Sequence, residues 1–166
     1  MRNQRLVAFT AAWFLLSALA GAVAAQESAR GSEHNRKGRQ YFEEAYYKQL
    51  PNGRQHEADR LFDLAAAEFQ DAIADNPRSA EAHRNLARLY YVRNQFPEAL
   101  DAYRSLTVLE PDDIDARVQL ALCYGQTGRL DEAIRELEVA KSKTDEPEAV
   151  RKLDEYIRKA KERRQD

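Results

Sequence analysis

Residues 86–111 read LARLYYVRNQFPEALDAYRSLTVLEP, and residues 120–145, thirty-four positions later, read LALCYGQTGRLDEAIRELEVAKSKTD. Both stretches carry Leu, Ala and Tyr at the same early places and Ala at the same later place. Part of the pattern also occurs thirty-four residues earlier, at Ala65, Phe69 and Pro77. A fixed period of about 34 residues is typical of stacked helix–turn–helix units. Such units bury their apolar faces only against their neighbours, so the sequence predicts a helical solenoid with a concave surface.

Turn residues divide the chain into segments with helical periodicity. Asn94 and Gly128, which are also thirty-four residues apart, can take the left-handed conformation that closes a helix. Ser79 and either Asp112 or Asp113 are expected to cap the helices that follow them. The pattern predicts helices at 34–50, 54–75, 79–93, 96–109, 113–126, 130–143 and 147–163.

The segment that begins at His83 resembles the tetratricopeptide repeat, which runs Trp-x-x-Leu-Gly-x-x-Tyr, then Ala-x-x-x-Phe, then Pro. The matching residues of this unit are Leu86, Ala87, Tyr90, Ala99, Tyr103 and Pro111. The next unit matches at Leu120, Ala121, Tyr124, Gly128, Ala133 and Ala140. It departs from the repeat at Arg117, in the tryptophan place, and at Asp145, in the proline place. The resemblance implies an all-α fold, a right-handed solenoid of about three antiparallel helix pairs with a C-terminal capping helix.

The repeat domain is expected to span 34–166. Its parts are an irregular unit at 34–79, units at 80–113 and 114–147, and the capping helix at 147–164. Small residues are expected where paired helices cross, and larger apolar residues fill the space around them. The residues predicted to pack the repeats are Ala65, Phe69, Pro77, Leu86, Ala87, Tyr90, Ala99, Tyr103, Pro111, Leu120, Ala121, Tyr124, Ala133 and Leu137.

The first unit is irregular because its turn comes early. The stretch Pro51-Asn52-Gly53 lies seven residues before Arg60, the place in register with Asn94. Seven residues is close to two helical turns, so a longer second helix keeps its apolar phase. We therefore predict a helix of about 22 residues at 54–75 that projects beyond its neighbours.

In tetratricopeptide repeats the first helix of each unit lines the concave face. The resemblance, with the seven-residue offset applied to the first unit, implies a partner-binding groove formed by Glu43, Tyr47, Glu81, Arg84, Arg88, Tyr91, Asp115, Val118 and Leu122. Arg and Tyr are the types that most often dominate binding energy. The alternative is that Arg84 and Arg88 form a solvated face offset by Glu81 while the tyrosines pack.

One branch of the family binds the acidic tails of cytosolic chaperones through five basic or amide side chains. Only Asn85 matches that set, and Asp115 and Gln119 stand at two of its basic places. A carboxylate would be repelled by Asp115, which argues against this function. A segment that combines one carboxylate with an apolar or aromatic side chain is the expected ligand, because Arg pairs with carboxylates through a planar fork.

Arg2 and Arg5 precede an uncharged stretch from Leu6 to Ala25 that ends in small residues. A basic start, an apolar core and a small-residue exit predict a secretory signal peptide at 1–25. An uncleaved membrane anchor is the alternative, with the repeat domain outside. The polar stretch 26–33 is expected to be a flexible leader. The chain is thus expected to be exported, as a periplasmic or secreted protein.

Composition and motifs argue against several functions. Without residues 1–25, which carry two arginines and no acidic residue, 24 Lys+Arg face 28 Asp+Glu, a formal charge of −4. This balance gives no footprint for nucleic acid. His34, His56 and His83 show no metal-ligand spacing, and Cys123, the only cysteine, has no paired base. We expect no enzymatic activity, no metal and no cofactor.

These patterns predict a non-catalytic scaffold or adaptor that binds a protein or peptide partner in its groove. The resemblance implies a role in cell-envelope assembly or secretion. The alternative is a regulatory subunit of an envelope enzyme, docked through its convex face or through the 54–75 helix. No nucleic-acid contact is expected, and membrane contact only if the N-terminal segment is retained.

Overall fold

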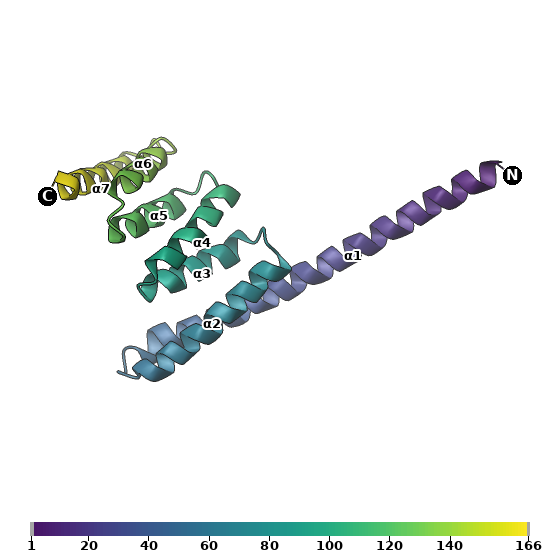
Figure 1. The fold of residues 1–166 in the computed structure, drawn as a ribbon, viewed down its shortest axis with the longest axis horizontal. Helices are drawn as coiled ribbons and strands as arrows, with labels where there is room; N and C mark the ends of the chain where they lie inside the picture. Colours follow the sequence, from purple (N-terminus) through teal and green to yellow (C-terminus); the bar gives the residue numbers. More distant parts are fainter. Residues whose placement is uncertain (1, 166) are drawn as a thin grey trace.

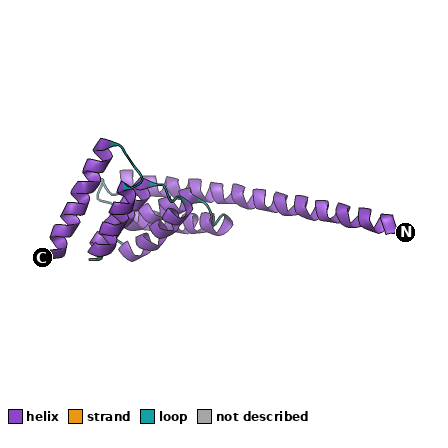
Figure 2. Ribbon diagram, turned by 90° about the horizontal axis from the view of Figure 1, so that it is seen from above, coloured by secondary structure: helices purple, strands orange, loops and turns teal. Residues whose placement is uncertain are grey.

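The computed structural model describes the backbone of residues 2–165 and the side chains of residues 21–165. Figures 1 and 2 show helices and loops. The elements in chain order are α1 (Arg2–Glu43), the π-helix η1 (Glu44–Gln49), α2 (Gln55–Asp75), α3 (Ala80–Val92), α4 (Phe96–Leu109), α5 (Ile114–Gln126), α6 (Leu130–Lys141) and α7 (Pro147–Gln165).

The helices stack as antiparallel pairs. α1 packs on α2, α3 on α4 and α5 on α6, and α7 covers α6 at the C-terminal end of the stack (Figure 1). The prediction of an all-α helix-pair solenoid with a C-terminal capping helix is confirmed. The bounds predicted for α2 to α7 agree with the structure within about two residues, the usual uncertainty of helix ends.

Turn chemistry sets where the helices begin and end. The Ser79 hydroxyl accepts a hydrogen bond from the Ala82 amide, and the Asp113 carboxylate accepts one from the Ala116 amide. Asp113, and not Asp112, is thus the cap of α5. In the turns, Asn94 has φ 58° and Gly128 has φ 74°. Both residues lie in the left-handed region, as predicted.

The core follows the repeat. The predicted alanines and large apolar residues are buried, except for the half-buried Tyr90. One hydrogen bond between helices also recurs with the same period. Gln70 donates to the Tyr90 hydroxyl, and thirty-four residues later Arg104 donates to the Tyr124 hydroxyl. Pro77 and Pro111, expected among the packing residues, are exposed in turns instead. The place of each proline is where the chain leaves one unit for the next, so the ring faces solvent.

The first hairpin is longer than the others. α2 has 21 residues, whereas α3 to α6 have 12 to 14, so the long second helix is confirmed. α1 begins well before the predicted helix 34–50 and includes 26–33, which we expected to be a flexible leader. The physical reason lies at Gly31, where an added Cβ would be 3.1 Å from the Ala72 carbonyl oxygen and 3.3 Å from Asp75. α1 therefore already packs on the end of α2 before residue 34.

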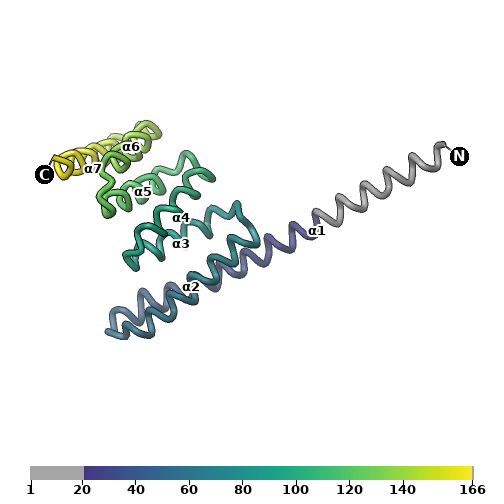
Figure 3. The backbone as a smooth tube through the Cα atoms, viewed as in Figure 1, coloured from purple at the N-terminus to yellow at the C-terminus, as the bar shows by residue number. Residues whose placement is uncertain are grey.

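On the N-terminal side of Gly31, α1 extends away from the stacked helix pairs (Figure 3). Residues 21–30 are mostly exposed, and they extend past the last turn of α2 (Figure 3). Most of the predicted signal peptide lies outside the residues whose side chains are described, and its cleavage stays a prediction. Within the part that is described, no helix is long and apolar enough to cross a membrane.

Candidate functional site

The first helices of the units form a groove with two hollows. The larger hollow, of about 330 Å³, lies between α3 and α5. Its lining residues are Arg84, Arg88, Tyr91, Val92, Tyr103, Asp115, Ala116 and Gln119. The smaller hollow, of about 80 Å³, lies between α1 and α3. It is lined by Arg39, Phe42, Glu43, Tyr47, Phe69, Asn85 and Arg88. The structure thus brings together six predicted groove residues, and Arg88 belongs to both hollows.

Three predicted groove residues lie outside these hollows. Glu81 is exposed beside them, where its carboxylate is 3.4 Å from the Arg39 guanidinium. Val118 is partly buried against the core of the stack. Leu122 is half-buried farther along α5. On α5 it is Gln119 that faces the larger hollow in place of Val118.

Arg84 is used inside the fold. Its guanidinium forms ion pairs with Asp113, the cap of α5, and with Glu110 at the end of α4. Burial raises the pKa of Asp113, but the Ala116 amide and the Arg84 charge outweigh that effect and lower the pKa below its ordinary value. Arg84 therefore holds two successive units together, and its charge is already balanced.

Arg88 has no such partner among the described side chains. Its guanidinium lies 5.3 Å from the centre of the Phe42 ring and donates to the Tyr47 hydroxyl at 3.4 Å. Among the side chains of residues 21–165, no carboxylate forms an ion pair with Arg88. The side chain is exposed, so the groove presents one arginine whose charge is not balanced by a contact.

Two polar residues of α1 beside the groove, Asn35 and Arg39, were not predicted from the sequence. Asn35, 4% exposed, accepts a hydrogen bond of 2.9 Å from the Asn85 amide, and Arg39 pairs with Glu81. The signal for both was the stretch Gly38-x-x-Tyr41, which repeats the small-x-x-Tyr pattern of the later units. At Gly38 an added Cβ would lie 2.6 Å from the Phe69 ring, so this residue is the close approach of the first helix pair.

Aromatic side chains form the α1 side of the groove. The rings of Phe42 and Tyr46 stack with centres 5.7 Å apart, and Tyr46 meets Tyr47 edge to face at 5.0 Å. Tyr47 is 59% exposed and Tyr46 37% exposed. On α3, Tyr91 contacts Phe96 edge to face at 5.6 Å. Aromatic rings that remain exposed beside an arginine form a surface suited to protein binding.

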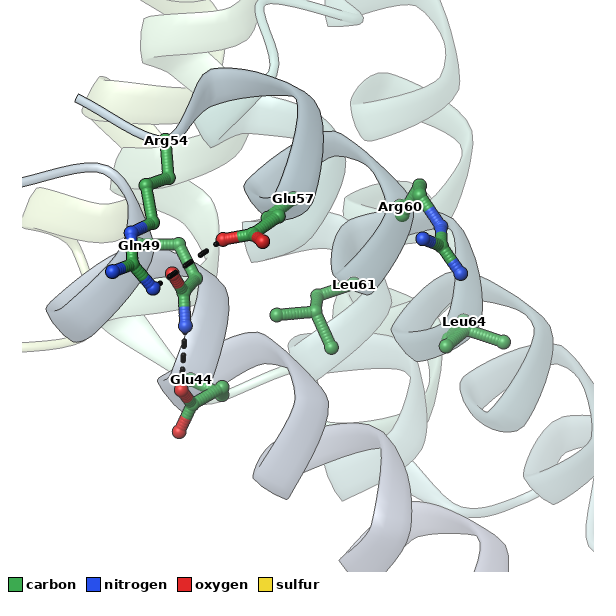
Figure 4. A pocket seen from close by; sticks show the side chains of 7 residues that line it. All are labelled: Glu44, Gln49, Arg54, Glu57, Arg60, Leu61 and Leu64. Carbon is green, nitrogen blue, oxygen red and sulfur yellow. Dashed lines mark hydrogen bonds and ion pairs between the residues drawn. The ribbon is translucent and has the colours of Figure 1, made fainter. Parts of the chain in front are cut away.

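A further hollow, of about 380 Å³, lies on the first hairpin (Figure 4). Leu61 and Leu64 of α2 form its apolar part, and Leu64 is 47% exposed. Its polar lining consists of Glu44, Gln49, Arg54, Glu57 and Arg60. None of these lining residues belongs to either hollow of the groove. This hollow therefore lies outside the groove.

The described side chains offer little for catalysis or metal binding. No group of three or more His, Cys, Asp or Glu side chains could hold a metal ion among them. Cys123 is fully buried, and burial raises the pKa of its thiol to about 12. The groove combines one unpaired cation, flanking carboxylates and aromatic rings, which is an arrangement for binding.

Two family models, both described as tetratricopeptide repeat, match residues 50–114 and 86–158. The chain belongs to the tetratricopeptide repeat family. No curated protein sequence matches the chain significantly.

Several solved structures share the fold. The TPR2B domain of yeast Sti1, in its pHsp70 complex, is 20% identical, with a TM-score of 0.63 over 82% of this chain and 99% of that chain. The Arabidopsis OM64 TPR domain is 16% identical, with a TM-score of 0.60 over 80% of this chain and 98% of that one. The Yersinia enterocolitica type III secretion chaperone SycD, in complex with a peptide of the translocator YopD, is 19% identical. Its TM-score is 0.58, over 75% of this chain and 92% of that one.

Proposed function

We propose that this protein is a non-catalytic scaffold that binds a segment of a partner polypeptide in the groove. The observation that carries the proposal is Arg88, an exposed arginine that lines both hollows of the groove and has no carboxylate partner among the described side chains. An arginine flanked by tyrosines is the kind of residue set that dominates protein interfaces. Two similar structures support a binding role for the fold, since those domains were solved with pHsp70 and with a YopD peptide.

The groove favours a ligand of mixed chemistry. Arg88 can accept a carboxylate in its planar fork, and the tyrosines around it can pack against an apolar or aromatic side chain. Glu43 and Asp115 line the same hollows and repel a uniformly acidic segment. Because exposed ion pairs contribute about 0–1 kcal/mol, the affinity is modest and falls with added salt.

This chemistry differs from the capture of acidic chaperone tails. The Asn85 amide is bonded to Asn35, and Asp115 and Gln119 stand where that branch has basic residues. Likeness in fold to a Sti1 domain therefore does not carry its ligand to this chain.

A peptide array tests the ligand. The array varies the number of carboxylates and the presence of an aromatic residue, and it is probed with the wild-type chain and with Arg88→Ala. We expect mixed peptides to bind best and Arg88→Ala to lose them. Best binders that are strongly basic and indifferent to Arg88→Ala would show that the groove is assigned wrongly.

We further propose that the chain is exported and acts in cell-envelope assembly or secretion. The support is the N-terminal sequence, with Arg2 and Arg5 before the uncharged stretch 6–25. Mass spectrometry of the expressed protein tests export: cleavage near Ala25 is expected, whereas an intact N-terminus in the membrane fraction indicates an anchored form.

A regulatory subunit of an envelope enzyme is the second candidate, and the hollow at Leu61 and Leu64 favours it. An exposed leucine beside charged residues suits a surface that docks on another protein. Leu64→Glu would abolish that docking and leave peptide binding in the groove intact.

A further inference from the structure

Compared with the second unit, the first hairpin is extended by one residue more on its first helix than on its second helix. From the close-approach residue to the left-handed turn residue there are fifteen positions in the first unit, Gly38 to Gly53, but seven in the second, Ala87 to Asn94. On the other side of the turn, Gly53 to Ala65 spans twelve positions and Asn94 to Ala99 spans five. Relative to the second unit, the first helix of the first unit is therefore extended by eight residues and its second helix by seven.

The π-helix η1 accommodates the one extra residue of the first helix. Two antiparallel helices joined by one turn must cover the same length, and seven residues make about two α-helical turns on each side. At the end of η1, the amide of Leu50, its C-cap, bonds to the Ala45 carbonyl, five residues earlier, at 3.0 Å. A single inserted residue is the usual origin of such a turn, and π-helical turns often occur at functional sites.

The insertion changes which side chains face the groove. In an α-helix, a residue five positions after Phe42 would point about 140° away from it. In a π-helical turn the fifth residue returns to nearly the same side, because the hydrogen bond itself joins residues five apart. Tyr47 lies within η1, five positions after Phe42, and it lines the same hollow as Phe42. Its hydroxyl reaches Arg88 at 3.4 Å.

We propose that η1 is the specificity element of the groove, and that it presents Tyr46 and Tyr47 as a platform for an aromatic side chain of the bound segment. This inference rests on the proposed function. Tyr46 and Tyr47 meet edge to face at 5.0 Å, yet both remain exposed in the free protein. Rings held this way offer contact area at little cost in conformational entropy. Arg88, against the same cluster, places the carboxylate of the ligand next to its ring.

Deletion of Lys48 tests the role of the π-helical turn directly. Lys48 lies inside η1 with an exposed side chain, so its removal should convert the turn to α-helix and rotate Tyr47 out of the groove. Two probe peptides from the array are compared, identical except for tryptophan or alanine beside the glutamate. The wild-type chain should bind the tryptophan peptide more tightly, by up to about tenfold. The deletion variant and Tyr47→Ala should bind both peptides alike.

Tyr156→Ala is the matched control, because Tyr156 is 38% exposed on α7, at the C-terminal end of the stack. It should keep the preference for tryptophan. Circular dichroism checks that each variant is folded, and if the deletion variant is not, Tyr47→Ala against Tyr156→Ala decides. A preference that survives in Tyr47→Ala overturns the inference. Arg88→Ala distinguishes binding in the groove from the aromatic platform. If Arg88→Ala weakens the binding of both peptides while the preference for tryptophan survives in Tyr47→Ala, the proposed groove is supported and the proposed platform is wrong.

Discussion

His83 and Arg117, thirty-four residues apart, make the same contact in successive repeats. The His83 Nε2 lies 3.1 Å from the Pro77 carbonyl oxygen, and the Arg117 guanidinium donates to the Pro111 carbonyl at 3.0 and 3.2 Å. Both residues occupy the tryptophan place of the repeat. A polar side chain here fastens the first helix of a unit to the turn that precedes it.

Arg117→Ala should destabilise the protein. Arg117 also pairs with Glu136 of α6 at 3.0 Å, and its side chain is mostly buried. Loss of bonds made by a charged donor should lower the free energy of unfolding by about 1–3 kcal/mol, measured by urea denaturation. Arg135→Ala is the control, because the Arg135 guanidinium is exposed and makes only a weak ion pair, at 4.0 Å from Glu132. An equal effect of the two variants would contradict this role of Arg117.

Gly38→Ala should destabilise the first hairpin. The new methyl group would lie 2.6 Å from the Phe69 ring, and overpacking typically costs about 1–3 kcal/mol. Gly125→Ala, where the nearest atom is 3.9 Å away, should be neutral or stabilising. Phe69→Leu in the Gly38→Ala background should recover part of the loss, and strictly additive effects would rule out this contact as the cause.

Asp113 should contribute stability that depends on pH. Its pKa is lowered in the folded protein, so the contribution is fully present above the unfolded value of about 3.8 and is lost as the pH falls through the folded value. Asp113→Asn keeps a capping side chain but removes the charge that pairs with Arg84. The difference in unfolding free energy between wild type and Asp113→Asn should therefore shrink below about pH 3.8. A difference that stays constant down to pH 2 would contradict it.

Cys123 should resist thiol reagents in the folded protein. Burial raises its pKa to about 12, and the thiolate is the reactive form. Alkylation at pH 8 should become rapid only across the urea unfolding transition, and because the chain has one cysteine, mass spectrometry reads the result directly. Rapid alkylation without denaturant would show that α5 opens on its own.

The repeat made most of the fold predictable, because each unit depends on local spacing. Ala87, Ala99, Ala121 and Ala133 mark the helix crossings in the sequence, and all four are buried where expected. The register of the first unit could not be predicted in the same way. A turn that is displaced by seven residues lengthens both helices of an antiparallel pair. The register of the first helix is therefore shifted by twice seven residues relative to the later units. The one extra residue in η1 adds to this shift, and no sequence pattern marks it.

The groove was predictable in place but not in its charges. Arg84 and Arg88 lie one turn apart and look equivalent in the sequence. The structure separates them because the α4–α5 turn brings Glu110 and Asp113 to Arg84 alone. Such pairing depends on where a loop places its acidic residues relative to the preceding unit, and helical periodicity carries no information about that.

A pull-down from cell-envelope extract tests whether the partner binds in the groove. Three forms of the chain with a C-terminal tag are compared: wild type, the groove variant Arg88→Ala with Tyr91→Ala, and Leu64→Glu in the hollow on α2. We expect that the groove variant loses the partner that wild type captures and that Leu64→Glu keeps it. The opposite result, capture by the groove variant and loss with Leu64→Glu, would contradict binding in the groove.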